Sequence, residues 1–82
     1  MHEKDKPINF TKREIKIIQL AAQGYTNKEI AKILNFSYYT IKSDFQNIIK
    51  KSNARNRINA IYILSLKGYV KLSMLNDTNK KG

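Results

Sequence analysis

Three polar side chains lie close together near the middle of the chain, at Lys42, Ser43 and Gln46. If this stretch is helical and Ile41 and Phe45 face a core, the three side chains project from the opposite side. A lysine can donate to guanine O6 or N7, a glutamine can pair with adenine, and a serine can donate or accept. The set is therefore suited to hydrogen bonding with base edges in the major groove of DNA.

A second group of polar residues is suited to contact with phosphate. Most of them cluster at two points where helices are predicted to begin, and there free backbone N–H groups and the helix dipole favour an anion. Such contacts position a protein on DNA without reading its sequence. The predicted phosphate contacts are Thr26, Asn27, Lys28, Ser37, Tyr38, Tyr39, Thr40 and Lys50.

Helix start and stop signals indicate the elements that carry these residues. Four residues that can cap a helix N-terminus precede apolar stretches: Thr11, Thr26, Ser37 and Asn56. The two threonines are each followed three residues later by glutamate, which is the capping-box pattern. Gly24 and Gly68 supply left-handed stops. With the apolar spacing, these signals predict helices over about 12–23, 27–35, 38–51 and 57–67, and no strand.

The block from 26 to 51 reads as a short helix, a tight turn and a longer helix, which is the helix-turn-helix pattern. In that motif the second helix lies in the major groove. The chain is expected to comprise a flexible N-terminal arm over 1–9, one all-α domain of four helices over 10–70, and a C-terminal tail over 71–82.

The overall charge favours a polyanionic partner. Sixteen Lys and Arg residues against six Asp and Glu give a formal net charge of +10, which attracts nucleic acid, an anionic membrane surface or an acidic protein. The chain has no cysteine, and its single histidine, His2, has no obvious second ligand beside it. We therefore expect no metal and no cofactor.

Other function classes are not favoured by the sequence. No apolar run approaches the roughly 20 residues of a membrane span, and the N-terminus lacks the apolar stretch of a signal peptide. A cytoplasmic protein that binds no membrane is expected. No histidine partners a nucleophile and no glycine-rich phosphate loop is present, so an enzyme is not expected.

Several motifs in a fixed order resemble the LuxR/GerE-type helix-turn-helix. They are Phe10-Thr11-x-Arg13-Glu14, Gly24-x-Thr26-Asn27-Lys28-Glu29-Ile30-Ala31, Ser37-x-x-Thr40-Ile41-Lys42 and Arg57-x-x-Ala60-Ile61. The resemblance covers about residues 10–70. It implies a four-helix domain of bacterial transcriptional regulators that binds DNA, usually as a dimer. It also implies that Lys42, Ser43 and Gln46 occupy the positions that meet base edges.

The chain departs from this pattern at the longer helix and its end. Asp44 stands where the family usually has histidine or another residue near the DNA backbone, and a carboxylate there repels phosphate unless it pairs with a cation or a cytosine amino group. Ser52 and Asn53 replace a leucine and a small residue, which predicts a looser helix end. Ile15 and Ile33 lie off the apolar stripes, as scattered surface residues or as a partner contact.

Two charged residues lie on apolar stripes. Glu14 shares its helix face with Ile17 and Ile18, and Arg57 shares its face with Ala60. One hypothesis is that Glu14 and Arg57 form an ion pair across the core, which would tie the first helix to the fourth. The competing role for Arg57 is a phosphate contact.

The fourth predicted helix is apolar on nearly all sides, as expected of a helix buried on two faces. Its second face, formed by Ile58, Tyr62 and Ser65, predicts a homodimer. The alternative is that the tail over 69–75 wraps back onto it. A symmetric dimer fits an inverted-repeat operator in double-stranded DNA. The alternative function is a protein-interaction module that binds another regulator or RNA polymerase.

Overall fold

The computed structural model describes residues 7–70, so residues 1–6 of the predicted arm and 71–82 of the predicted tail lie outside the described part. The helices are α1 (Lys12–Ala22), α2 (Asn27–Leu34), α3 (Tyr38–Lys51) and α4 (Arg57–Leu66), and residues 7–70 contain no strand. The predicted all-α fold of four helices is confirmed. Between residues 7 and 70, the helices lack the length and the apolar character that a membrane span requires.

The helix starts follow from local side-chain chemistry. In α1 the Thr11 hydroxyl accepts from the Glu14 backbone N–H at 3.0 Å, and the Glu14 carboxylate accepts from the Thr11 N–H at 2.9 Å. An equivalent capping box begins α2. Each box satisfies two backbone N–H groups that the helix itself leaves unpaired. All four predicted caps are confirmed: Thr11, Thr26, Ser37 and Asn56.

The helix ends lie within one residue of the predicted positions. Gly24 and Gly68 adopt left-handed φ angles of 100° and 88°, a conformation that costs glycine little because it has no Cβ. The end of α3 is not loose, contrary to prediction. The Ser52 side chain is buried, and its hydroxyl donates to the Ile48 carbonyl at 2.6 Å. Asn53 then turns the chain at a φ of 57°, which asparagine tolerates.

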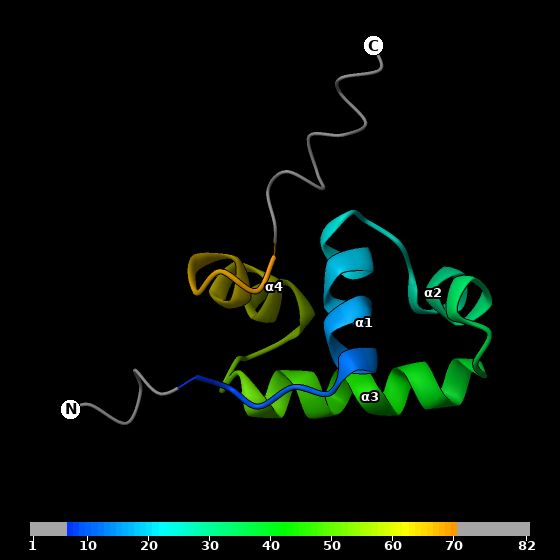
Figure 1. Ribbon diagram of the computed structural model, residues 1–82, viewed down its shortest axis with the longest axis horizontal. Coiled ribbons are helices and arrows are strands. Elements are labelled where there is room, and N and C mark those ends of the chain that lie inside the picture. The colour runs from blue at the N-terminus through cyan, green and yellow to red at the C-terminus, as the bar shows by residue number, and fades with distance from the viewer. Residues whose placement is uncertain (1–6, 71–82) are drawn as a thin grey trace, which may run out of the picture.

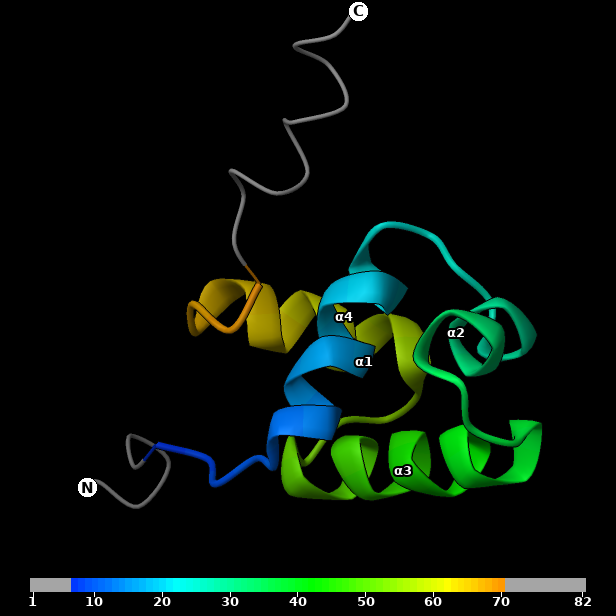
Figure 2. The same ribbon diagram turned by 45° about the vertical axis from the view of Figure 1, so that its right-hand side comes forward.

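The core lies where α1 crosses α3, with α2 and α4 on either side of α1 (Figure 1). Val70 adds a buried side chain to this core after α4. The largest fully buried side chains come from all four helices and are Ile17, Ile18, Ile30, Ile41, Ile48 and Leu64. This packing leaves one long side of α3 free of other helices (Figures 1 and 2).

The chain before α1 is anchored to the chain after α4. The backbone N–H of Ile8 donates to the Tyr69 hydroxyl at 2.7 Å, and the Phe10 ring meets the Tyr69 ring edge-on at a centroid distance of 5.3 Å. Lys51 Nζ donates to the Asn9 carbonyl at 3.1 Å. Residues 8 and 9 therefore contact the folded domain, whereas the sequence analysis places them in the N-terminal arm.

Candidate nucleic-acid interface

The free side of α3 carries the three residues predicted to read bases. Ile41, Phe45 and Ile48 are buried beneath α1, whereas Lys42, Ser43 and Gln46 are all exposed. None of these three side chains forms a hydrogen bond or ion pair with another described residue. Their donors and acceptors are therefore available to a ligand.

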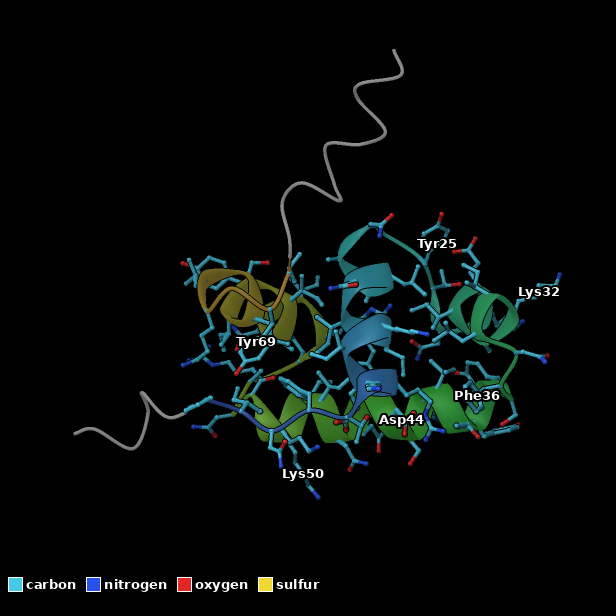
Figure 3. The ribbon with its side chains drawn as sticks, in the orientation of Figure 1. Tyr25, Lys32, Phe36, Asp44, Lys50 and Tyr69 are labelled. Carbon is cyan, nitrogen blue, oxygen red and sulfur yellow. The ribbon has the colours of Figure 1, made fainter. Side chains whose placement is uncertain are left out.

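Two further residues extend this surface. Lys50 points away from the body of the molecule (Figure 3), as expected of a residue that reaches toward phosphate. Asn47 is exposed as well and was missed by the sequence analysis. Its position directly after Gln46, between the buried Phe45 and Ile48, was the signal that could have identified it.

The first predicted phosphate cluster lies beside the starts of two other helices. Thr26, Asn27 and Lys28 line a shallow depression of about 470 Å³ together with Tyr38 and Arg57. The beginnings of α2, α3 and α4 therefore converge there. Two cationic side chains and several polar groups line this depression, a composition that suits an anion.

The hydroxyls at the start of α3 are engaged with each other. Ser37 Oγ accepts the Thr40 backbone N–H at 3.1 Å and lies 3.0 Å from Thr40 Oγ1, to which it donates. Thr40 is half-buried, while Ser37 is exposed. Both hydroxyls therefore shape the N-terminus of α3, a structural role beyond the predicted contact with phosphate.

The predicted ion pair between Glu14 and Arg57 is wrong. Glu14 is buried and instead accepts Lys51 Nζ at 2.7 Å, because the last turn of α3 passes beside the start of α1. Burial raises the pKa of Glu14, but the hydrogen bond from Lys51 and the backbone N–H of Thr11 outweigh it and leave the pKa below its ordinary value of 4.5. The pair joins α1 to α3 rather than α1 to α4.

Arg57 has different partners at the start of α4. Its guanidinium donates to Asn27 Oδ1 at 2.6 Å and to the Tyr25 carbonyl at 2.8 Å, and it lies 4.3 Å from the centre of the Phe45 ring. Burial lowers the pKa of Arg57 from its ordinary value, yet a guanidinium keeps its charge. This side chain connects α4 to the first residues of α2.

Asp44 finds its cation within the protein. It is buried on the side of α3 that meets α1 (Figure 3), and its carboxylate accepts Arg13 Nε at 2.6 Å and Nη2 at 3.2 Å. The hydrogen bond with Asp44 raises the pKa of Arg13. Of the two partners considered from sequence, a cation and a cytosine amino group, the structure shows the cation. The negative charge within α3 is thus neutralised.

Residues 9–64 match the family described as bacterial regulatory proteins, luxR family. The chain belongs to this family. It is 40% identical to the nitrate/nitrite response regulator NarP of Escherichia coli (strain K12) over 58 residues, which are 71% of this chain and 27% of NarP. It is 35% identical to the transcriptional regulatory protein DegU of Brevibacillus brevis over 68 residues, or 82% of this chain and 29% of DegU.

The fold agrees with this assignment. The solved structure of the transcription factor GerE superposes with a TM-score of 0.74 at 31% identity, covering 82% of this chain and 98% of GerE. The resemblance found in the sequence motifs is confirmed, and the chain is a LuxR-family helix-turn-helix DNA-binding domain of transcriptional regulators. It spans less than a third of the length of NarP and DegU.

This LuxR-family domain also exposes an apolar stripe on α4. Ile58, Tyr62 and Leu66 are 80%, 62% and 70% exposed and follow one another at intervals of one helical turn. Ser65 is exposed beside them, although its hydroxyl donates to the Ile61 carbonyl at 2.8 Å. Tyr69 contacts Ile8 and Phe10 instead of this stripe, and residues 71–75 lie outside the described part.

The two off-stripe isoleucines have different surroundings. Ile15 is half-buried, whereas Ile33 is 51% exposed. Ile33 lines a small groove between α1 and α2 with Leu20 and Leu34, and Lys16 and Gln19 form its polar border. This groove is lined by residues of α1 and α2 and by none of α3.

Proposed function

We propose that this domain binds an inverted-repeat operator in double-stranded DNA as a homodimer, with α3 in the major groove. Lys42, Ser43 and Gln46 hydrogen-bond to base edges. The observation that carries the proposal is the contrast along α3. On the buried side, the Asp44 carboxylate is paired with Arg13. On the exposed side, the donors and acceptors of Lys42, Ser43 and Gln46 have no partner among the described residues.

Electrostatic attraction supports the same arrangement. The net charge of +10 draws the domain to the DNA backbone, and each phosphate contact releases condensed counterions. The proposed phosphate contacts are those predicted from sequence except Tyr39, with Arg57 added because it lines the same depression as Lys28. They are Thr26, Asn27, Lys28, Ser37, Tyr38, Thr40, Lys50 and Arg57.

The apolar stripe on α4 supports the proposed dimer. Three large apolar side chains in contact with water form a surface that a second copy can bury. A two-fold axis through α4 would present the two copies of α3 to half-sites about one helical turn apart. The exposed Ile33 favours a second contact, with another regulator or RNA polymerase.

The test is to select bound duplexes from a random-sequence pool and compare binding of the parent and a Lys42→Ala, Gln46→Ala double variant by fluorescence anisotropy. Each lost base contact is worth about 1–3 kcal/mol, so the double variant should bind the selected duplex at least tenfold more weakly. Binding to a scrambled duplex should change little. For the parent, affinity should fall steeply as salt increases.

The matched control is Lys16→Ala with Gln19→Ala, which removes the same two residue types from α1. It should leave discrimination between selected and scrambled duplexes intact. A double variant at 42 and 46 that discriminates as well as the parent would contradict the proposed reading face. If no sequence is enriched and salt has no effect on binding, the protein-interaction alternative is favoured instead.

A further inference from the structure

One side chain on α3 is exposed in a way that neither capping nor packing explains. Tyr39, the second residue of the helix, is 75% exposed, more than any other aromatic residue between 7 and 70. Its ring meets the ring of Tyr38 edge-on, with centroids 5.3 Å apart and planes inclined at 77°. The neighbouring ring limits the directions in which the Tyr39 ring can turn, so its exposed apolar surface is partly oriented.

The helical register places Tyr39 in the middle of the free face. At 100° per residue, positions 39, 43, 46 and 50 fall within about 60° of one another around the helix axis. The buried Ile48 lies on the opposite side, about 180° from Tyr39. Tyr39 is thus aligned along the helix with Ser43, Gln46 and Lys50. Lys42 lies toward one edge of the exposed face.

Tyr38 occupies a different position although it is adjacent in sequence. It is about half as exposed as Tyr39 and lines the depression that also contains Lys28 and Arg57. A tyrosine at that edge is suited to a phosphate contact through its hydroxyl. Tyr39 lies in the first turn of α3, in line with Ser43 and Gln46. The N-terminal residues of a recognition helix are those that contact base edges, so Tyr39 is placed to meet a base rather than a phosphate.

We propose that the ring of Tyr39 contacts the 5-methyl group of a thymine in the major groove and so determines specificity at that base pair. The inference depends on the proposed insertion of α3 into the groove. Thymine is the base that presents a methyl group there, and apolar side-chain surface is what recognises it. This role replaces the phosphate contact that the sequence predicted for Tyr39.

The test removes the methyl group from the DNA and the ring from the protein. Each thymine of one half-site of the selected duplex is replaced in turn by deoxyuridine, and binding of the parent, Tyr39→Phe and Tyr39→Ala is measured by fluorescence anisotropy. At one position the parent and Tyr39→Phe should each lose about fourfold in affinity, which corresponds to one buried methyl group. Tyr39→Ala should bind the two duplexes equally.

Lys42→Ala is the matched control on the same helix, because it should bind more weakly overall and still distinguish thymine from deoxyuridine. Circular dichroism establishes that each variant is folded. The proposal is overturned if Tyr39→Phe loses as much affinity as Tyr39→Ala, which assigns the hydroxyl to a phosphate. It is also overturned if no replacement of thymine by deoxyuridine in the half-site weakens binding of the parent more than it weakens binding of Tyr39→Ala. The Lys42→Ala, Gln46→Ala variant separates this failure from a failure of the proposed function. If that variant no longer distinguishes the selected duplex from the scrambled one, the proposed groove binding holds and only the role of Tyr39 fails.

Discussion

The carboxylate of Glu14 performs two functions at the crossing of α1 and α3. One oxygen accepts both the Thr11 backbone N–H and the Lys51 ammonium, at 2.9 and 2.7 Å. The same ammonium also lies 5.6 Å from the centre of the Phe10 ring. A single ionised group thus caps one helix and holds the end of another, so its protonation should affect the stability of the whole domain.

We predict that Glu14→Gln lowers the free energy of unfolding by about 1–2 kcal/mol at neutral pH, the range of a charge-assisted hydrogen bond discounted because Lys51 is partly exposed. The pKa of Glu14 is lowered in the folded state, so its contribution is complete above the unfolded-state value. The difference between parent and variant should shrink as the pH falls through the folded-state value, below 4.5. Urea unfolding of the parent and Glu14→Gln, from neutral pH to acidic pH, measures this difference in unfolding free energy.

Glu29→Gln is the control for this experiment. Glu29 caps α2 through the same pair of backbone hydrogen bonds but is exposed. We expect a smaller loss of stability from it, because no partner from another helix is released. A difference between the parent and Glu14→Gln that stays constant down to pH 3 would show that the ion pair with Lys51 contributes little.

Between elements, the angle at which α1 crosses α3 is held by two ion pairs. The pairs join the adjacent residues Arg13 and Glu14 of α1 to Asp44 and Lys51, which lie about two turns apart on α3. The guanidinium of Arg13 also lies 4.6 Å from the centre of the Phe36 ring in the turn before α3. Asp44 therefore helps to orient α3 from its buried side.

We predict that Asp44→Ala lowers the melting temperature but leaves the preferred operator sequence unchanged. The loss should be smaller than that of Ile48→Ala, which empties a core position at a cost of about 2–5 kcal/mol, because Arg13 can regain water when its partner is removed. Thermal unfolding and selection from a random duplex pool measure the two effects. An altered preference at one base pair would instead indicate that Asp44 reads a base.

How far the sequence predicts this domain depends on the range of each interaction. Caps such as Thr11 with Glu14 involve neighbours three residues apart, so the sequence alone identifies them. The partner of Glu14 could not be found this way, because Lys51 is 37 residues distant and only the crossing of two helices brings them together. Asp44 was difficult to interpret for the same reason. The exposed face of α3 was predictable, since it follows from helical periodicity.

At the scale of the whole molecule, the two surfaces proposed for binding lie on different helices. The exposed face of α3, with Lys42, Ser43 and Gln46, runs along one side of the domain. The stripe of Ile58, Tyr62 and Leu66 lies on α4, which Figure 2 shows behind α1 and above α3. Separate surfaces allow one copy to contact DNA and a second copy at the same time. A change confined to one surface should therefore leave the other intact.

We predict that Ile58→Asp prevents dimerisation on DNA without unfolding the domain. Ile58 is 80% exposed in the first turn of α4, where a carboxylate interacts favourably with the helix dipole, but a charge on the apolar stripe opposes its burial against a second copy. Sedimentation with the selected duplex should show two parent chains per duplex and one chain of the variant. Ile33→Asp, an equivalent change at an exposed isoleucine on α2, should retain two chains. Two chains of Ile58→Asp per duplex would place the dimer contact elsewhere.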